Sequence, residues 1–414
     1  MSTKNLYIFP AEEKEKERAV HNKIKELFNS NNSKTISDPD YYYWKSKMLL
    51  SNISSNAKLL LITAKFMYSK SFYTHAASLL LEAMLKEPYN HDIYFLLGVI
   101  HQTTNARQDA KIAFNKNLLC LNKQNPLYWN GQTKEDSILI VANGVGECVL
   151  ASRQINSLRQ YAKRIGIITK PQFHELAESI KNIDFCLFSD NPIKGGEKFI
   201  QEQNTGIKLV RTEPIMAMNE DIFSHPLRHE KSINVKPNLD SYWRAQMNSV
   251  KDGSIQLIGL CWNTKQISPL HPNRSFKLED LRIVSNLDHY KLASFQNGYG
   301  SEQLDVCDFK ESFVSCQQEL SEKRNFFDTI AAINQCDYFF TCDTGIAQIS
   351  SALGIKTVVF TQDKPSATWA GEGDKSYLYQ NTIVHRKLPD ELWCESINRF
   401  INEKDLKDYF ESKT

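Results

Sequence analysis

Long hydrophobic runs are missing from this chain of 414 residues. Apolar runs such as residues 59–63, 138–142 and 357–360 are far short of the roughly 20 apolar residues that span a bilayer. The N-terminal segment becomes charged at Glu12, where a secretory signal would become apolar. We therefore expect a soluble cytoplasmic protein without a membrane span.

A surplus of either charge is also missing. Fifty Lys and Arg against 48 Asp and Glu leave a formal charge of +2, too little to favour a nucleic-acid partner. The nine cysteines form no C-x-x-C pair, which argues against a disulfide framework and a zinc ribbon. His225 and His229 have the spacing of a helical metal pair, but Pro226 lies between them. None of these patterns predicts a bound metal ion.

Three common catalytic motifs are absent as well. The chain contains no G-x-x-x-x-G-K-[ST] stretch, no H-E-x-x-H pair and no G-x-S-x-G elbow. These absences argue against a P-loop nucleotide hydrolase, a zinc protease and a serine hydrolase of the α/β type.

The length fits two or three domains, and the pattern changes along the chain. Residues 1–38 indicate a charged leader, with a helix over residues 12–28 that has little to bury. Residues 39–126 contain a repeat with a period of 34: Ala64, Ala76, Leu80 and Ala83 recur as Gly98, Ala110, Phe114 and Asn117.

Small residues at this period are typical of tetratricopeptide helix pairs, because they let antiparallel helices approach closely. Two good units are too few for a free-standing array, so we expect them to dock on the domain that follows. Such repeats could bind a peptide segment. They could equally be plain helical hairpins that mediate only subunit contacts.

Strands and helices alternate through residues 127–250 and again through residues 251–414. The expected strands are 137–142, 164–169, 184–188, 207–210, 255–262, 291–296, 338–341 and 356–361. The expected helices are 147–162, 171–180, 240–247, 278–286, 326–335 and 346–353. This alternation predicts two Rossmann-like α/β halves, with the ligand in the cleft at the carboxyl ends of the strands.

The loop after the first strand contains Gly144 and Gly146, which would let the backbone approach a ligand at a helix N-terminus. Val149 replaces the third glycine of a dinucleotide fingerprint, and no acidic residue ends the second strand at residues 168–170. A nicotinamide enzyme is therefore disfavoured. Glu147 is either a general base at the cleft or a first-turn acid that is favourable to the helix dipole.

A second candidate loop runs from a strand through Asp343, Thr344 and Gly345 directly into a helix. Its free N–H groups and the Thr344 hydroxyl would suit a diphosphate, or one of these side chains simply caps the helix. The loop after residues 257–262 adds Asn263, Lys265 and Arg274 beside the same cleft, and a guanidinium clamps phosphate oxygens well.

Several segments resemble, in order, one known family. They are Trp129-Asn130-Gly131, Gly144-Val145-Gly146-Glu147 with Arg153, Gly259-Leu260-Cys261-Trp262, Arg274-Ser275, Ser294-Phe295-Gln296-Asn297-Gly298, Asp328-Thr329-Ile330-Ala331-Ala332-Ile333, Cys342-Asp343-Thr344-Gly345-Ile346-Ala347-Gln348 and Ala352-Leu353-Gly354. Together with the repeats, they resemble tetratricopeptide-repeat proteins that carry a heptosyltransferase-like (glycosyltransferase family 9-like) domain. Some bacterial flagellin glycosyltransferases are built in this way.

The resemblance implies a GT-B fold, in which two Rossmann-like domains face a cleft and the second holds most of the nucleotide-sugar. It implies a metal-independent inverting transfer with the nucleotide-sugar as substrate and no other cofactor, in line with the lack of an Asp-x-Asp motif in the two halves. The donor residues that it implies are Asp343, Thr344 and Gly345 at the diphosphate, Arg274 at the leaving nucleotide, and Asn263 and Gln296 in the donor pocket.

On the acceptor side, the resemblance makes Glu147 the catalytic base, at a position where the family usually has Asp. Gln348 stands where the family usually has a His that contacts donor phosphate, and Gln can donate a hydrogen bond but carries no positive charge. The acceptor would be a protein, a peptide or a saccharide, bound partly by the repeats. The alternative is a non-catalytic scaffold in which repeats and an inert GT-B domain serve interactions only.

Overall fold

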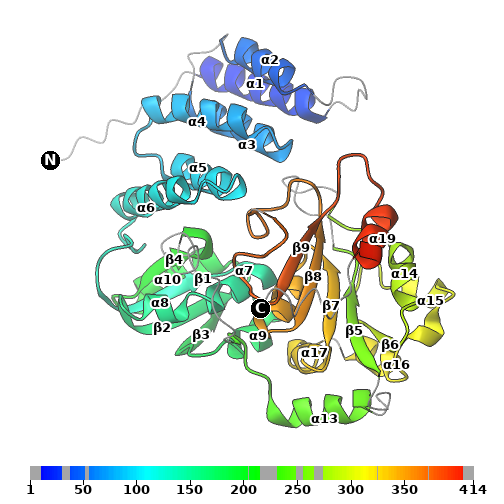
Figure 1. Cartoon of the computed structure of the whole chain (residues 1–414). Helices are drawn as coiled ribbons and strands as arrows, with labels where there is room; N and C mark the ends of the chain where they lie inside the picture. Colours follow the sequence, from blue (N-terminus) through cyan, green and yellow to red (C-terminus); the bar gives the residue numbers. More distant parts are fainter. Residues whose placement is uncertain are drawn as a thin grey trace.

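The computed structural model describes residues 11–29, 38–51, 56–203, 205–214, 231–248, 255–264, 274–323, 325–371 and 373–403. Its elements form a layer of helices and two parallel sheets that lie side by side beneath that layer (Figure 1). Lys265 and the pair His225 and His229 lie outside the described residues.

The helical layer consists of hairpins stacked one below another (Figure 1). Its helices are α1 (Ala11–Asn29), α2 (Pro39–Ser51), α3 (Ala57–Ser69), α4 (Tyr73–Lys86), α5 (His91–Thr103) and α6 (Arg107–Gln124). The turns after α3 and α5 contain Ser71 and Asn105, which share a positive φ of 62° and 61° and are 34 residues apart.

The eight repeat positions singled out in the sequence are all buried. A Cβ on Gly98 would lie 2.8 Å from the ring of Phe114, so the close approach of α5 and α6 requires a glycine there. The positions 34 residues apart therefore lie inside the packed helix pairs, and Gly98 lets α5 and α6 approach closely.

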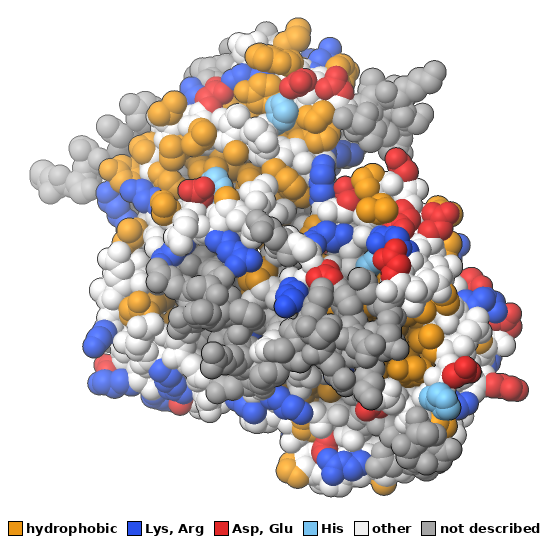
Figure 2. Space-filling model, viewed as in Figure 1, with side chains coloured by type: hydrophobic (Ala, Val, Ile, Leu, Met, Phe, Trp, Pro, Cys, Tyr) orange, Lys and Arg blue, Asp and Glu red, His pale blue; other side chains and the backbone are white. Residues whose placement is uncertain are grey.

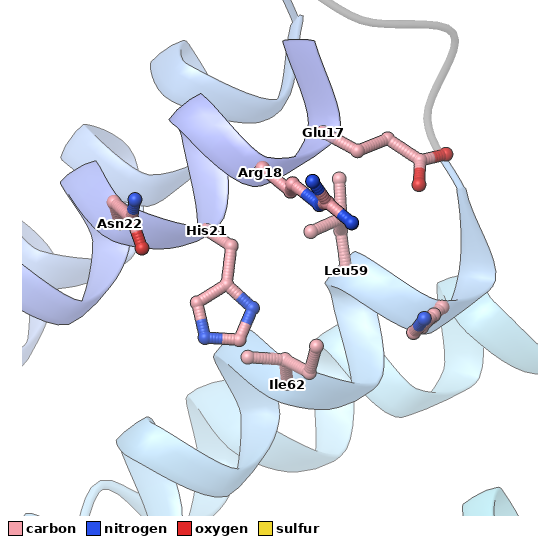
Figure 3. Close-up of a pocket in the computed structure, with 7 residues that line it drawn as sticks. Glu17, Arg18, His21, Asn22, Leu59 and Ile62 are labelled. Carbon is pink, nitrogen blue, oxygen red and sulfur yellow. The ribbon is translucent and has the colours of Figure 1, made fainter. Parts of the chain in front are cut away.

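Helix α1 has more to bury than the sequence suggested. Ile24 and Phe28 are buried, and the Phe28 ring stacks on Tyr42 and Phe66 with centroids 5.1 and 5.3 Å apart. Side chains of α1 also face Leu59 and Ile62 of α3 across a surface pocket (Figure 3). The helix is thus part of the helical layer, because its apolar residues recur every fourth position on one face.

The first sheet contains β1 (Glu135–Val141), β2 (Ala162–Thr169), β3 (Phe185–Phe188) and β4 (Lys208–Arg211). Within the described residues these strands are parallel in the order β3-β2-β1-β4. The helices around it are α7 (Val145–Ser152), α8 (Ile155–Leu158), η1 (Pro171–Phe173), α9 (His174–Glu178) and α10 (Pro192–Gln203). The single helix expected over 147–162 is wrong: α7 and α8 are short, and Ala162 already begins β2.

The second sheet contains β5 (Gln256–Cys261), β6 (Tyr290–Ser294), β7 (Tyr338–Cys342), β8 (Lys356–Thr361) and β9 (Thr382–Arg386). The described strands are parallel in the order β6-β5-β7-β8-β9. The helices beside it are η2 (Leu278–Leu281), α14 (Arg282–Ser285), α15 (Gln303–Val306), η3 (Lys310–Ser312), α16 (Gln317–Glu322), α17 (Phe326–Ile333), α18 (Gly345–Ala352) and α19 (Trp393–Glu403). The two predicted parallel α/β halves are therefore present.

Helix α13 (Pro237–Asn248) precedes β5 in sequence but packs against the second half, on α17. The indole N–H of Trp243 donates to Asp328 Oδ1 at 2.8 Å, and Asp240 accepts from Asn334 and Gln335 at 2.7 Å each. Elements of the second half therefore begin before residue 250.

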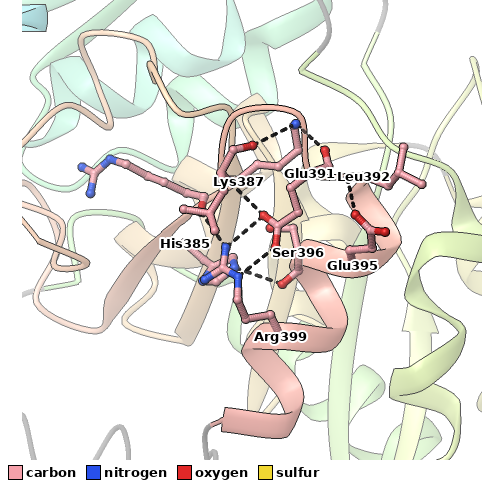
Figure 4. Close-up of polar contacts among 9 residues, drawn as sticks. His385, Lys387, Glu391, Leu392, Glu395, Ser396 and Arg399 are labelled. Atoms are coloured by element: carbon pink, nitrogen blue, oxygen red, sulfur yellow. Dashed lines mark hydrogen bonds and ion pairs between the residues drawn. The ribbon is translucent and has the colours of Figure 1, made fainter.

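Strand β9 and helix α19, which the sequence did not predict, complete the second half. Figure 4 shows Arg399 of α19 bound to Glu391, with Nε to Oε1 at 2.8 Å, and His385 of β9 bound to the Ser396 carbonyl at 3.0 Å. The hydrogen bonds from Arg399 hold the pKa of Glu391 down at about 2. This ion pair and the hydrogen bond from His385 hold α19 against the edge of the sheet.

The helical layer contacts the first half, on which the sequence predicted that it docks, and it contacts the second half as well. Gln102 of α5 donates to the Tyr377 hydroxyl at 3.1 Å, beside the second sheet. Asn125, at the end of α6, donates to Glu197 of α10 at 3.1 Å, and Leu121 of α6 belongs to the same apolar cluster as Leu139 and Val141 of β1.

Candidate functional site

The starts of α7 and α18 meet where the two halves face each other. A Cβ on Gly345 would lie 2.5 Å from Cγ1 of Val145, and a Cβ on Gly146 would lie 2.8 Å from Nε2 of Gln348. Each helix follows directly from the carboxyl end of a central strand, β1 or β7. The two glycine-containing loops predicted from the sequence therefore come together, one from each sheet. Gly144 is the N-cap residue of α7 and has an extended backbone, and no atom lies within 4 Å of the place where its Cβ would be.

Glu147 lies in the first turn of α7, and its Oε2 accepts a hydrogen bond from the Asn143 N–H at 2.5 Å. Burial, with a second contribution from the charge of Glu213, raises the pKa of Glu147 to about 7. The backbone N–H group and Arg211 act in the opposite direction. A carboxyl group with such a pKa can take up a proton at neutral pH, as a general base must.

Glu213 is a site residue that sequence reasoning missed. It follows β4, which pairs with β1 in a register that sets Arg211 opposite Val141, and the Thr212 hydroxyl donates to the Val141 carbonyl at 3.2 Å. This pairing carries Glu213 to the carboxyl end of β1, beside Glu147. Burial raises the pKa of Glu213 as well. The sequence does place Glu213 among the candidates, because it is an acidic residue soon after the strand predicted over 207–210.

Arg211 is the cation of this corner. Its positive charge stabilises the ionised forms of Glu147 and Glu213 and so acts to lower the pKa of both. Its guanidinium also lies 5.7 Å from the centroid of the Phe95 ring on α5. The corner that holds the two carboxyl groups therefore lies next to the helical layer.

In the second loop, Thr344 is the N-cap of α18, and its hydroxyl accepts from the Ala347 N–H at 3.2 Å. Asp343 Oδ1 accepts from the indole N–H of Trp369 at 2.8 Å, and Oδ2 lies 3.9 Å from Nη1 of Arg274. Oδ2 and the guanidinium form a loose ion pair beside the start of α18, where further helix N–H groups have no partner within the helix. A cation and a helix N-terminus together suit a phosphate group.

Gln296 and Asn263 join the ends of β5 and β6. Gln296 Oε1 accepts from the N–H groups of Trp262 and Asn263 at 3.0 and 2.9 Å, and its Nε2 donates to the carbonyls of Asn263 and Tyr299 at 3.0 and 2.7 Å. The Gln296 amide is therefore engaged by backbone, so it shapes the loops of this pocket.

Gln348 lies between the two halves and is only 6% exposed. Its Oε1 lies 3.5 Å from the Tyr379 hydroxyl, and its amide nitrogen faces Gly146. The side chain thus fills the contact between α18 and the start of α7.

The described residues contain neither a metal-binding cluster nor a membrane-spanning helix. Among them, no group of three or more His, Cys, Asp and Glu side chains is arranged to hold a metal ion. None of the described helices is both long and apolar enough to cross a bilayer.

Comparison with known proteins gives only distant likenesses. No protein-family model and no curated protein matches the chain. The structure is similar to a glycosyl transferase family 9 protein from Veillonella parvula, with a TM-score of 0.47, 13% identity and coverage of 68% of this chain and 98% of that one. It is also similar to the ADP-heptose LPS heptosyltransferase II of E. coli, with a TM-score of 0.45, 12% identity and coverage of 67% and 96%.

A third likeness extends over the helical layer. An O-GlcNAc transferase of Thermobaculum terrenum is 12% identical with a TM-score of 0.34, over 98% of this chain and 94% of that one. With identities of 12–13% and TM-scores below 0.5, these likenesses do not establish an activity. The function is therefore inferred from the residues of the site.

Proposed function

We propose that this chain is a glycosyltransferase of the GT-B type, which moves a sugar from a nucleotide-sugar donor to an acceptor hydroxyl. One observation carries the proposal: α7 and α18 start face to face, so the carboxyl group of Glu147 and the loop of Arg274, Asp343 and Thr344 border the same interface between two parallel sheets. In such sheets the ligand lies at the carboxyl ends of the strands.

The donor diphosphate would lie at the start of α18. The N–H groups at the start of the helix and the Arg274 guanidinium favour its charge. The absence of a side chain at Gly345 makes room for Val145 of α7. Asp343 is itself anionic, so its part is to orient Arg274, while the Asn263 loop shapes the donor pocket. The proposed transfer uses no divalent metal, and the nucleotide-sugar is a substrate, so no other cofactor is needed.

In the transfer, the acceptor oxygen attacks the anomeric carbon as the bond from that carbon to the phosphate oxygen breaks. Glu147 takes the acceptor proton, and the electron pair of the broken bond leaves with the diphosphate, whose charge Arg274 offsets. A single displacement inverts the anomeric centre. With a pKa of about 7, a large share of Glu147 is ionised at neutral pH and ready to accept the proton.

The acceptor would be bound partly by the helical layer, which we infer to be a tetratricopeptide array. Figure 2 shows hydrophobic side chains gathered over this layer. Between α4 and α6 lies a groove of about 530 Å³ whose lining includes Met84, Leu97, Ile112 and Leu119. A protein or peptide acceptor, as in flagellin glycosylation, fits an apolar groove of this size better than a free saccharide does.

We propose the division into residues 1–38 as leader, 39–126 as repeats, 127–250 as the acceptor half and 251–414 as the donor half. Within this division, α1 of the leader packs against the repeats, and α13 at the end of the acceptor half packs against the donor half. The proposed setting of the reaction is the cytoplasm, with neither a nucleic acid nor a membrane as partner.

The test compares Glu147→Gln with the exposed control Glu202→Gln on α10. Release of nucleoside diphosphate from a panel of nucleotide-sugars is measured with and without protein acceptors, alongside nucleotide affinity. We expect Glu147→Gln to lower transfer by about 10²–10⁴-fold with nucleotide affinity nearly unchanged, and Glu202→Gln to match the wild type. Arg274→Ala should weaken nucleotide binding itself. Full transfer by Glu147→Gln would remove the base assignment, and a chain that binds no nucleotide would favour the inert scaffold.

A further inference from the structure

The connection from β8 to β9 contacts both the helical layer and the donor loop. Its described residues include Trp369, Tyr377 and Tyr379, which are 1%, 8% and 2% exposed. The rings of Trp369 and Tyr379 lie against each other with centroids 5.9 Å apart. These aromatic residues therefore form a buried bridge between parts of the molecule that are distant in sequence.

At one end, the bridge fixes Asp343. The indole N–H of Trp369 donates to Asp343 Oδ1 at 2.8 Å, which leaves Oδ2 on the side of Arg274, 3.9 Å from Nη1. The backbone of Trp369 is held in turn, because its N–H donates to the Ser366 carbonyl at 2.9 Å and its carbonyl accepts from Arg386 at 3.4 Å. The hydrogen bond from the indole thus favours the Asp343 rotamer in which Oδ2 lies on the side of Arg274.

At the other end, the bridge is bound by α5 and α6. The Tyr377 hydroxyl accepts from Gln102 Nε2 at 3.1 Å and donates to the Ala367 carbonyl at 3.0 Å, two residues before Trp369. The Arg107 guanidinium lies over the Tyr377 ring, 5.0 Å from its centroid. The hydroxyl of Tyr377 thus joins the helical layer to the turn that carries Trp369.

We propose that Gln102, Tyr377 and Trp369 are positioning residues that let the helical layer set the orientation of Asp343 and Arg274, and hence the affinity of the nucleotide site. This inference rests on the proposed function, since it takes Arg274 to be at the nucleotide. A buried polar chain of this kind has few alternative arrangements, because each group that loses its partner stays out of water. A ligand that shifts α5 or α6 would therefore change nucleotide affinity, and bound nucleotide would change the affinity for that ligand by the same factor.

The experiment removes one link at a time from the full chain. The variants are Tyr377→Phe and Trp369→Phe, and the matched control is Tyr68→Phe, whose hydroxyl lies 3.2 Å from Thr103, the neighbour of Gln102 on α5. Affinities for ADP, UDP, GDP and CMP are measured by calorimetry, together with the melting temperature of each variant. We expect Tyr377→Phe and Trp369→Phe to weaken the preferred nucleotide by at least about fivefold, the lower end of typical coupling, and Tyr68→Phe to stay within about twofold even if its melting temperature falls.

A double variant separates positioning from a general loss of stability. If Tyr377 acts through Trp369, then Tyr377→Phe has no further effect on nucleotide affinity in the Trp369→Phe background. Additive losses would overturn the proposed order of contacts. Wild-type affinity in Tyr377→Phe, with Arg274→Ala still weakened, would overturn the link while leaving the nucleotide site in place.

Hydrogen exchange without nucleotide tests the link independently of the proposed function. We expect the amides of residues 343–348 to exchange faster in Tyr377→Phe and Trp369→Phe than in Tyr68→Phe. If the wild type binds no nucleotide, the proposed function fails, and this exchange pattern alone decides whether the helical layer is linked to Asp343. Equal exchange in all three variants would overturn the link.

Discussion

Glu147 and Glu213 place two carboxyl groups in one partly buried corner, and their charges set the pH range in which the site can accept a proton. Burial and the neighbouring Glu213 raise the pKa of Glu147 to about 7. We expect kcat/KM for transfer to rise with pH through about 7 and then level off, because only the ionised carboxylate is a base.

Glu213→Gln tests the coupling between these two carboxyl groups. Removal of the neighbouring negative charge should lower the pKa of Glu147, so the rise in kcat/KM should move to lower pH with little change in the plateau. The pH profile of transfer from the preferred nucleotide-sugar measures this. A profile identical to that of the wild type would show that Glu213 does not act on the base.

The same raised pKa affects folding stability, with a definite sign. In the unfolded chain Glu147 titrates near its ordinary value of 4.5, so between about 4.5 and 7 the folded protein holds a proton that the unfolded chain releases. The free energy of unfolding should therefore fall as pH rises through this window, by about 1–3 kcal/mol, and flatten above it. Urea unfolding of the wild type and Glu147→Gln at a series of pH values measures the difference, and a parallel pH dependence in both would contradict this account.

Two site residues show that the sequence pattern can mark a residue near a strand end without showing which other loops lie beside it. Glu213 reaches Glu147 only because β4 pairs with β1, although the two acids are far apart in sequence. Trp369 reaches Asp343 across the connection that follows β8. Single-sequence patterns locate loops that end strands, but they do not state which loops from other strands or connections lie beside them.

At the scale of elements, the contact between α7 and α18 decides whether the two loops share one site. A Cβ on Gly345 would come within 2.6 Å of both Cβ and Cγ1 of Val145, whereas Gly144 has open space and an extended backbone. We expect Gly345→Ala to lower the free energy of unfolding by about 1–3 kcal/mol, as overpacking does, and to weaken nucleotide binding. Gly144→Ala is the control and should change neither quantity appreciably.

Gly146→Ala should lower the free energy of unfolding by more than Gly144→Ala and by less than Gly345→Ala. Its added Cβ would meet the amide nitrogen of Gln348, at the end of a flexible side chain that can move aside. If thermal unfolding ranked Gly144→Ala as the most damaging of the three, the described contact between the helices would be wrong.

Helix α1 offers a second test at this scale. Phe28 stacks on Tyr42 and Phe66, so Phe28→Ala should lower the free energy of unfolding of the helical layer by about 3 kcal/mol. Glu26→Ala changes an exposed residue of the same helix and should have little effect. Equal urea midpoints for the two variants would mean that α1 is a loosely attached leader after all.

The elements that were predicted correctly share a strong local signal. Strands β1, β5, β7 and β8 are apolar, β-branched or aromatic runs that end in loops with Gly, Asp or Asn, and the repeat positions keep their spacing of 34. Strand β9 was missed because it is short and ends in His385 and Arg386. The burial of α1 was missed because charged residues outnumber the few apolar residues on its buried face.

At the scale of the whole molecule, three bodies meet around one site. The helical layer contacts the first half through Glu197 and the second half through Tyr377. This arrangement would place an acceptor held by the helices above the interface that contains Glu147 and Arg274. If the chain transfers a sugar in this way, a nucleotide binds at that interface.

The measurement that tests this requirement most directly is a thermal-shift scan of the full chain with ADP, UDP, GDP and CMP, without added metal, on the wild type and on Arg274→Ala. A ligand at about 100 times its dissociation constant stabilises the folded state by about 2.7 kcal/mol, which is easily detected. The account predicts that one nucleotide raises the melting temperature of the wild type clearly more than the others do, and that Arg274→Ala loses this shift. No shift with any nucleotide or intact nucleotide-sugar, or an equal shift in Arg274→Ala, would contradict a donor site at this interface.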